Sequence, residues 1–133
     1  MARILIIEDS PINMELLTFL LANEGHELFL AERALPGIEI ARQQPLDLIL
    51  MDVTMPDVGG IEAAKMLRAH PNTRTVPLIA VTAMAMSGDK ERIIAEGFDE
   101  YIAKPVDFAQ LLEKVARFTG QSPSSDSDES QGT

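Results

Sequence analysis

The sequence contains no cysteine and no apolar run that approaches the ~20 residues of a membrane-spanning helix. Without thiols, disulfide scaffolds, thiolate metal sites and thiol catalysis are excluded. The N-terminal residues lead into a short apolar run that ends at Glu8 and Asp9, which is too brief for the hydrophobic core of a secretory signal. We therefore expect a cytoplasmic protein.

Basic residues are also scarce, with 11 Lys and Arg against 21 Asp and Glu, so the formal net charge is −10. Binding to nucleic acid or to an anionic membrane needs clustered basic side chains. We expect neither as a direct partner. Apolar residues make up 46% and charged residues 24% of the 133 residues, values typical of one globular domain with its own core.

Short apolar runs alternate with helical segments along the chain. A helix is expected to begin with Ser10 as its N-cap and Pro11 as its first residue, and to stop at Gly25. Asp107, with Gln110 three residues later, predicts another helix start. The expected strands are residues 4–7, 26–31, 46–51, 77–81 and 100–103, and the further expected helices are residues 35–43, 61–69, 89–96 and 107–118.

Five βα units in series predict an α/β fold with a doubly wound, five-stranded parallel sheet. The first, third and fourth apolar runs have no polar alternation, as expected of strands that are covered on both faces. We assign residues 1–120 to this domain. Residues 121–133 are acidic and serine-rich and contain no apolar side chain, so they predict a disordered tail.

Polar residues follow the expected strands at the point where each strand ends. Glu8 and Asp9 follow the first strand, Asp52 the third, Thr82 the fourth and Lys104 the fifth. In an open doubly wound sheet, ligands bind outside the carboxyl ends of the strands. We therefore expect these side chains to meet at one edge of the sheet.

The chemistry of this set is specific. Crowded carboxylates repel one another unless a cation is present, and a set of oxygen ligands without His or Cys suits Mg²⁺. An aspartate can act as a nucleophile that forms an acyl phosphate, while lysine and threonine can bind the transferred oxygens. Each residue alone has a simpler interpretation as a helix cap, a strand residue or a surface charge. Together they favour phosphoryl transfer.

Four motifs, "IIEDS", "LILMDVTMPDVGG", "IAVTAMAM" and "YIAKPV", occur in this order and spacing. With them the chain resembles the receiver domain of two-component response regulators over about residues 2–119. The resemblance implies a flavodoxin-like (βα)5 fold with the strand order 2-1-3-4-5. It is greatest to stand-alone relay and cell-cycle regulators and to the receivers of hybrid histidine kinases.

The resemblance also implies roles for the acids. Asp52 is the expected phosphoacceptor, taking a phosphoryl group from a phosphohistidine on a sensor histidine kinase or phosphotransfer protein. Asp9 and Asp52 are expected to ligate Mg²⁺ directly, with Glu8 acting through water and Thr54 through its backbone carbonyl. Thr54 also stands where aspartyl-phosphate phosphatases place a second aspartate, which argues against a Mg²⁺-dependent enzyme of that class.

Further roles are implied around the phosphate. Lys104 would hold a phosphate oxygen, and its peptide bond to Pro105 would be cis. The Thr82 hydroxyl and the Ala83 N–H would face the phosphoryl group, and Tyr101 would be the aromatic switch that moves with Thr82. We expect no enzyme beyond weak self-phosphorylation from small phosphodonors and self-dephosphorylation.

The segment of residues 89–96 offers only Ile93, Ile94 and Ala95 as apolar anchors, and such helices belong to the low-stability end of a fold. Because it follows Thr82, it is well placed to shift on phosphorylation. We expect this helix, the fifth strand and the last helix to form the face that binds an unidentified downstream effector.

Other functions fit the sequence less well. A phosphorylation-independent adaptor would have no need for the intact set of acids, hydroxyl and lysine. Flavin or dinucleotide binding is disfavoured because neither a Ser/Thr/Gly-rich phosphate loop nor a G-x-G-x-x-G follows the first strand. Asp57 is assigned to the turn before Gly59.

Overall fold

The computed structural model describes residues 2–53, 57–83 and 89–120. In these residues five strands alternate with five helices, in the predicted order. The strands are β1 (Arg3–Ile7), β2 (Glu27–Ala31), β3 (Leu48–Met51), β4 (Leu78–Thr82) and β5 (Glu100–Ala103). The helices are α1 (Pro11–Asn23), α2 (Ala34–Gln43), α3 (Gly60–Ala69), α4 (Asp89–Ala95) and α5 (Phe108–Thr119).

The strands form one parallel sheet in the order β2-β1-β3-β4-β5, which confirms the predicted topology. Ile7 at the end of β1 pairs with Met51 at the end of β3. Thr82 at the end of β4 pairs with Ala103 at the end of β5. The polar residues that follow these strands therefore leave the sheet at the same edge.

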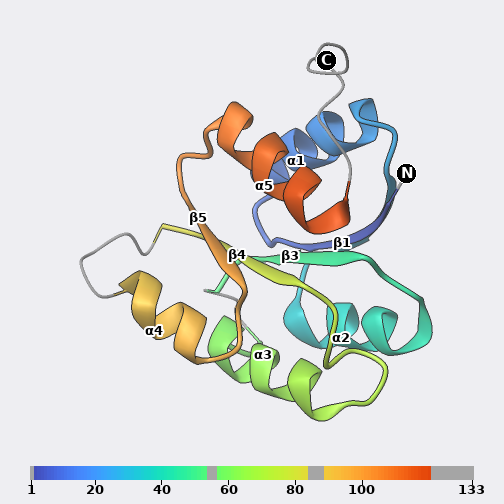
Figure 1. The fold of residues 1–133 in the computed structure, drawn as a ribbon, viewed down its shortest axis with the longest axis vertical. Helices are drawn as coiled ribbons and strands as arrows, with labels where there is room; N and C mark the ends of the chain where they lie inside the picture. Colours follow the sequence, from blue (N-terminus) through green and yellow to red (C-terminus); the bar gives the residue numbers. More distant parts are fainter. Residues whose placement is uncertain (1, 54–56, 84–88, 121–133) are drawn as a thin grey trace.

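The helices cover both faces of the sheet, with α1 and α5 on one side and α2, α3 and α4 on the other (Figure 1). Successive side chains of a strand point to opposite faces. In β1, Leu5 and Ile7 accordingly join the core under α2 and α3, whereas Ile4 and Ile6 join the core under α1 and α5. The continuous apolar run predicted a strand buried on both faces, and the structure confirms it.

The predicted helix caps are present. The Ser10 hydroxyl accepts a hydrogen bond from the Asn13 N–H at 3.4 Å, and the Asp107 carboxylate accepts one from the Gln110 N–H at 3.0 Å. Gly25, just beyond α1, has a φ of 86°, a conformation that glycine adopts without strain. These local signals place the start and the end of α1 correctly.

One strand begins two residues later than the sequence predicts. The third strand was expected from Leu46, but β3 begins at Leu48. The Arg3 N–H donates a hydrogen bond to the Asp47 carboxylate at 2.8 Å. In a longer β3, a backbone carbonyl would accept this hydrogen bond instead. The apolar run alone could not reveal that a side chain is the acceptor.

Arg68 ties the end of α3 to the segments that enter β4 and β5. Its guanidinium donates twice to the Gly97 carbonyl, at 3.0 and 2.9 Å, and once to the Val76 carbonyl at 2.6 Å. It also pairs with the Asp99 carboxylate at 2.8 Å. The connection from α4 to β5, where Gly97 has a φ of 118°, is therefore anchored to α3.

Two further sequence predictions concern the C-terminal tail and the absence of a membrane-spanning helix. The tail of residues 121–133 lies outside the described residues, so its disorder stays a prediction. Within the part of the chain that is described, no helix has both the length and the apolar character needed to cross a membrane.

Candidate functional site

Glu8 and Asp52 are fixed by hydrogen bonds that continue the sheet one residue past β1 and β3. The Glu8 N–H donates to the Ala31 carbonyl and the Asp52 N–H to the Ile7 carbonyl, each at 3.0 Å. Only 1% of Glu8 and 4% of Asp52 is exposed. Two carboxylates are thus held side by side in a buried position, where neither gains full hydration.

Asp9 completes the acidic cluster. Glu8, Asp9 and Asp52 each offer a carboxylate oxygen, and these oxygens lie within 4.8 Å of one another. Asp9 is exposed, unlike the other two. The predicted meeting of the three acids at the carboxyl edge of the sheet is therefore present, with one of them open to solvent.

Lys104 reaches this cluster from the end of β5. Its ammonium group donates to Asp52 Oδ2 at 2.8 Å and to Glu8 Oε2 at 3.3 Å. Its backbone N–H donates to the Thr82 carbonyl at 2.8 Å, and its peptide bond to Pro105 is cis, as expected from the resemblance. One cation is therefore shared between two buried carboxylates.

The pKa values follow from this crowding. Burial raises the pKa of the Glu8 carboxyl, and the nearby Asp52 charge acts in the same direction, so the opposing effects of the Ser10 N–H and Lys104 do not prevail. Burial acts to lower the pKa of Lys104, but its hydrogen bonds to Asp52 and Glu8 outweigh burial and raise it. The Lys104 ammonium therefore stays protonated at neutral pH. Its single positive charge does not balance the three carboxylates.

The donor set fits a hard divalent cation. Three carboxylates against one ammonium leave a formal charge of −2 when all four groups are ionised. Glu8 Oε1 is buried and accepts no hydrogen bond from the described residues, although the Lys104 ammonium lies 3.1 Å away. A metal-bound water could satisfy this oxygen, and oxygen-only ligands with one exposed member suit Mg²⁺.

The remaining predicted residues occupy neighbouring positions. Thr82 is buried at the end of β4, and Ala83, which follows it, is exposed. Tyr101 is half-buried in β5, where it pairs with Ala80 and packs against the core under α2, α3 and α4. Thr54, the expected backbone ligand, lies outside the described residues.

Asp57 has a role that the sequence did not indicate. Its two carboxylate oxygens accept the N–H groups of Ala34 and Leu35, at 3.0 and 2.9 Å, at the start of α2. Arg33, the N-cap residue of that helix, provides no side-chain hydrogen bond. Desolvation acts to raise the pKa of Asp57, but these N–H groups and that of Val58 lower it overall. The segment after the acid site therefore caps a different helix, and the separation of 23 positions between Ala34 and Asp57 hid this contact.

Gly60 sets the close approach of α3 to the segment that follows Asp52. Its N–H donates to the Val53 carbonyl at 2.7 Å. A Cβ atom at position 60 would lie 2.3 Å from the Val53 Cα, a backbone atom that cannot move aside. The second glycine of the "GG" pair is therefore needed for packing and not only to open the helix.

The comparisons with known proteins agree with this geometry. A family model for the response regulator receiver domain matches residues 4–116. Polar-differentiation response regulators DivK from Brucella anthropi and Brucella ovis are each 38% identical over 117 residues, covering 88% of this chain and 95% of the relative.

Solved structures lead to the same family. The receiver domain of the sensor histidine kinase PA1611 from Pseudomonas aeruginosa, described with a magnesium ion in its active-site cleft, is 35% identical with a TM-score of 0.83. The match covers 90% of this chain and 98% of that one. A histidine kinase receiver domain from Syntrophus aciditrophicus is 28% identical with a TM-score of 0.82, covering 100% of this chain and 98% of that one. The chain therefore belongs to the response regulator receiver domain family.

Proposed function

We propose that this protein is a phosphoacceptor of a cytoplasmic two-component phosphorelay, in which Asp52 receives a phosphoryl group from the phosphohistidine of a sensor histidine kinase or phosphotransfer protein. The observation that carries the proposal is the excess of negative over positive charge at the carboxyl edge of the sheet. Asp52 and Glu8 are buried and share the Lys104 ammonium, and Asp9 adds a third carboxylate. Such an excess of negative charge is costly unless it binds a cation.

The transfer itself needs little from the protein beyond position and charge. A carboxylate oxygen of Asp52 attacks phosphorus, the phosphorus–nitrogen bond of the phosphohistidine breaks, and the imidazole nitrogen keeps the electron pair. The Lys104 ammonium, already 2.8 Å from Asp52 Oδ2, is placed to pair with an oxygen of the arriving phosphoryl group. The same geometry supports weak self-phosphorylation from small donors and slow hydrolysis.

The expected metal is Mg²⁺, with Asp9 and Asp52 as direct ligands, Glu8 acting through water and the Thr54 carbonyl as a further ligand. When bound, the ion neutralises carboxylate and phosphoryl oxygens together. The magnesium described for the receiver domain of PA1611, at 35% identity, supports this assignment. Glu8 Oε1, which is buried and accepts no hydrogen bond from the described residues, supports a water-mediated contact in particular.

The switch is proposed to run through Thr82 and Tyr101 to the face formed by α4, β5 and α5, which binds a downstream effector. The Thr82 hydroxyl and the Ala83 N–H would turn to the phosphoryl group. In α4, Ile93 is buried but Ile94 is 37% exposed, so little core packing opposes a shift of this helix. Arg68 anchors the connection beyond the C-terminal end of α4, which leaves the end nearest Thr82 as the one to move.

The test is intact-mass spectrometry after incubation with Mg²⁺ and acetyl phosphate. The wild type is expected to gain one phosphoryl group, and both Asp52→Asn and an EDTA-treated sample to gain none. Asp47→Asn, an exposed aspartate just before the amino end of β3, is the matched control and should be phosphorylated normally.

Two outcomes would favour the alternatives. If the wild type neither gains mass nor binds beryllofluoride, the protein is a phosphorylation-independent adaptor. Multiple turnover of a phosphomonoester such as p-nitrophenyl phosphate would instead identify an aspartyl-phosphate phosphatase. Phosphorylation of Asp52→Asn to the wild-type extent would place the acceptor elsewhere.

A further inference from the structure

The connection from β2 to α2 contacts both of the segments that bring acids to the carboxyl edge of the sheet. The Ala31 carbonyl accepts the Glu8 N–H at 3.0 Å. Three residues later, the N–H groups of Ala34 and Leu35 donate to the two carboxylate oxygens of Asp57. A short stretch of backbone therefore joins the segment that follows β1 to the segment that follows β3.

This connection is itself held firmly by the core. Ala31 and Ala34 are buried. Helix α2 lies so close to β1 that a Cβ atom at Gly37 would be 2.5 Å from the Ile7 Cδ1. The Ile7 carbonyl in turn accepts the Asp52 N–H at 3.0 Å. The first turn of α2 and the end of β1 therefore form one close-packed support beside the acid cluster.

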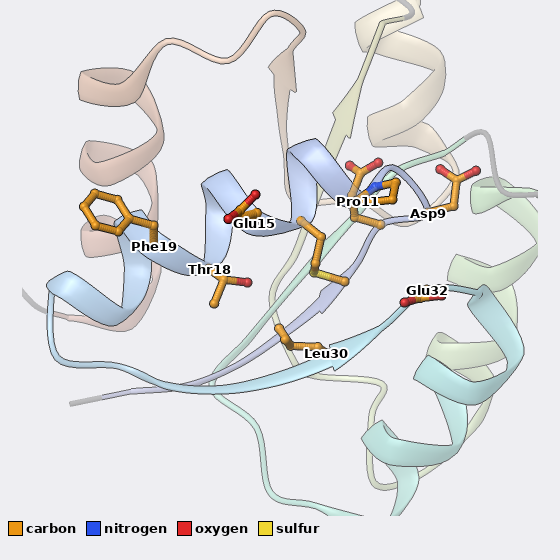
Figure 2. Close-up of a pocket in the computed structure, with 9 residues that line it drawn as sticks. Asp9, Pro11, Glu15, Thr18, Phe19, Leu30 and Glu32 are labelled. Atoms are coloured by element: carbon orange, nitrogen blue, oxygen red, sulfur yellow. The ribbon is translucent and has the colours of Figure 1, made fainter.

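The connection also lies beside the exposed member of the acid cluster. Apolar side chains, among them Phe19 and Leu30, line a groove of about 460 Å³ between α1 and β2. Figure 2 shows Glu32, which belongs to the connection, and Asp9 toward the same end of this groove. The start of α2 is thus on the side of the cluster that is open to solvent.

Two contacts in the described part of the chain hold the segment that follows Asp52. The Gly60 N–H donates to the Val53 carbonyl at 2.7 Å, and the Asp57 carboxylate binds the start of α2. Thr54, whose carbonyl is a proposed ligand of Mg²⁺, stands between Val53 and Asp57 in the sequence. Of these two contacts, that of Asp57 is the one that reaches the support formed by α2 and β1.

We propose that Asp57 is a positioning residue for the metal and phosphoryl site, because it holds the segment that follows Asp52 against the start of α2. This role rests on the proposed function, in which the same segment contributes a ligand of Mg²⁺. Asp57 is not one of the three acids of the cluster and acts through the backbone. Ligands that lose their supporting hydrogen bonds are less well preorganised and bind a cation more weakly.

A purely structural cap would behave differently, and Asp99 provides that case. Asp99 is an exposed aspartate like Asp57, and its carboxylate likewise accepts a backbone N–H, that of Leu78, at 2.9 Å. It lies before the amino ends of β4 and β5, at the opposite edge of the sheet from the acid cluster. Asp99→Ala therefore removes the same charge and a comparable contact without touching the support of the site.

The test compares the wild type with Asp57→Ala, Asp57→Asn and Asp99→Ala at a temperature where circular dichroism shows each to be folded. An NMR titration of the amide resonances with Mg²⁺ alone measures metal affinity without phosphoryl transfer. Asp57→Ala should bind Mg²⁺ about tenfold more weakly, the lower end of the range for lost outer-shell partners of a metal site. Asp57→Asn keeps an oxygen acceptor and should lose less, and Asp99→Ala should bind like wild type.

Phosphorylation by acetyl phosphate supplies the second measurement. For Asp57→Ala, the Mg²⁺ concentration that gives half of the maximal rate should rise by the same factor as the dissociation constant. The rate at saturating Mg²⁺ should fall much less, because the Asp52 carboxylate and Lys104 are unchanged. If Asp57→Ala does not fold, a weaker affinity of Asp57→Asn than of Asp99→Ala decides for the positioning role.

The contrary outcomes are distinct. A wild type that binds no Mg²⁺ and gains no phosphoryl group would overturn the proposed function and the role of Asp57 together. A wild type that does both, with Asp57→Ala and Asp57→Asn of equal Mg²⁺ affinity to it, would overturn the positioning role alone and leave Asp57 as a helix cap. Equal weakening in Asp57→Ala and Asp99→Ala would overturn it too, since a lost charge at either edge would then suffice.

Discussion

Two long cationic side chains lie at opposite ends of β4 and β5, and their surroundings differ in charge balance. Lys104, at the carboxyl ends, faces two buried carboxylates with a third beside them. Arg68, before the amino ends, faces backbone carbonyls and the single carboxylate of Asp99, which also accepts the Leu78 N–H at 2.9 Å.

The difference separates a structural cluster from the one that we propose to be reactive. Around Arg68 each donor meets an acceptor, so the cluster is complete and can only stabilise the fold. Around Lys104 negative charge is in excess, so the cluster gains from binding a divalent cation, which can in turn hold a phosphoryl group. The proposed function therefore rests on the unequal charge of the buried site, and not on its burial or on its number of hydrogen bonds.

The largest expected effect is on the reactive cluster. Lys104→Met should lower the rate of phosphorylation by acetyl phosphate about a hundredfold, since removing one preorganised donor to a developing oxyanion typically costs ~10²–10³. Quantitative intact-mass spectrometry over time measures this rate. Lys65→Met removes an exposed ammonium on α3 that pairs with Glu96 at 3.6 Å, and it should leave the rate unchanged. Equal rates for Lys104→Met and wild type would end the distinction between the two clusters.

The structural cluster should respond in stability instead. Arg68→Ala is expected to lower the free energy of unfolding by about 2–3 kcal/mol, the scale of losing hydrogen bonds from a charged group, without reducing the extent of phosphorylation at a temperature where the variant is folded. Urea unfolding followed by circular dichroism gives the first quantity. Arg68→Lys should recover little, because an ammonium lacks the planar fork.

Arg74→Ala, at an exposed arginine close in sequence, is the control for the loss of a positive charge. If Arg68→Ala unfolded like wild type, the contacts at Gly97 and Val76 would carry no net stability. If it stayed stable but lost phosphorylation, the two clusters would be coupled rather than separate.

The smallest effect on stability is expected at Asp57. The negative charge of its carboxylate is balanced by backbone N–H groups instead of a cation. Asp57→Asn should lower the melting temperature less than Arg68→Ala does. Because the pKa of Asp57 is lowered in the folded protein, its contribution is present above the unfolded pKa of about 3.9 and is lost as the pH falls through the folded pKa.

Thermal melts at several pH values check this prediction. The melting temperatures of wild type and Asp57→Asn should differ at neutral pH and converge in acid, whereas Glu91→Gln, at an exposed position on α4, should show no such convergence. A difference that persists unchanged in acid would mean that the carboxylate charge does not hold the start of α2.

Local patterns were enough for most of the fold. Ser10 and Asp107 cap the helices that they were predicted to cap, because an N-cap is set by residues within one turn. The beginning of β3 was placed two residues early, because the interaction of Asp47 with Arg3 joins distant parts of the chain. The largest boundary error thus falls where a side chain replaces a backbone partner, and the other boundaries differ by at most one residue.

The candidate site could be predicted to the level of which residues meet. Glu8, Asp9, Asp52 and Lys104 follow strands, and the carboxyl ends of parallel strands share one edge, so their convergence follows from topology. The sequence could not tell that Glu8 is more deeply buried than Asp9, nor that Lys104 divides its ammonium between two acids. Those features depend on which side chain each neighbouring strand places beside them.

By itself the sequence determined the order of the elements, the parallel sheet and the acids at its edge, since each is encoded by residues close together or by strand ends. Only the tertiary structure decided that Asp57 caps α2, that Arg68 secures the connection into β5 and that α1 keeps an open apolar groove beside β2. The physical reason is that these features depend on the packing of segments that no local period or spacing relates.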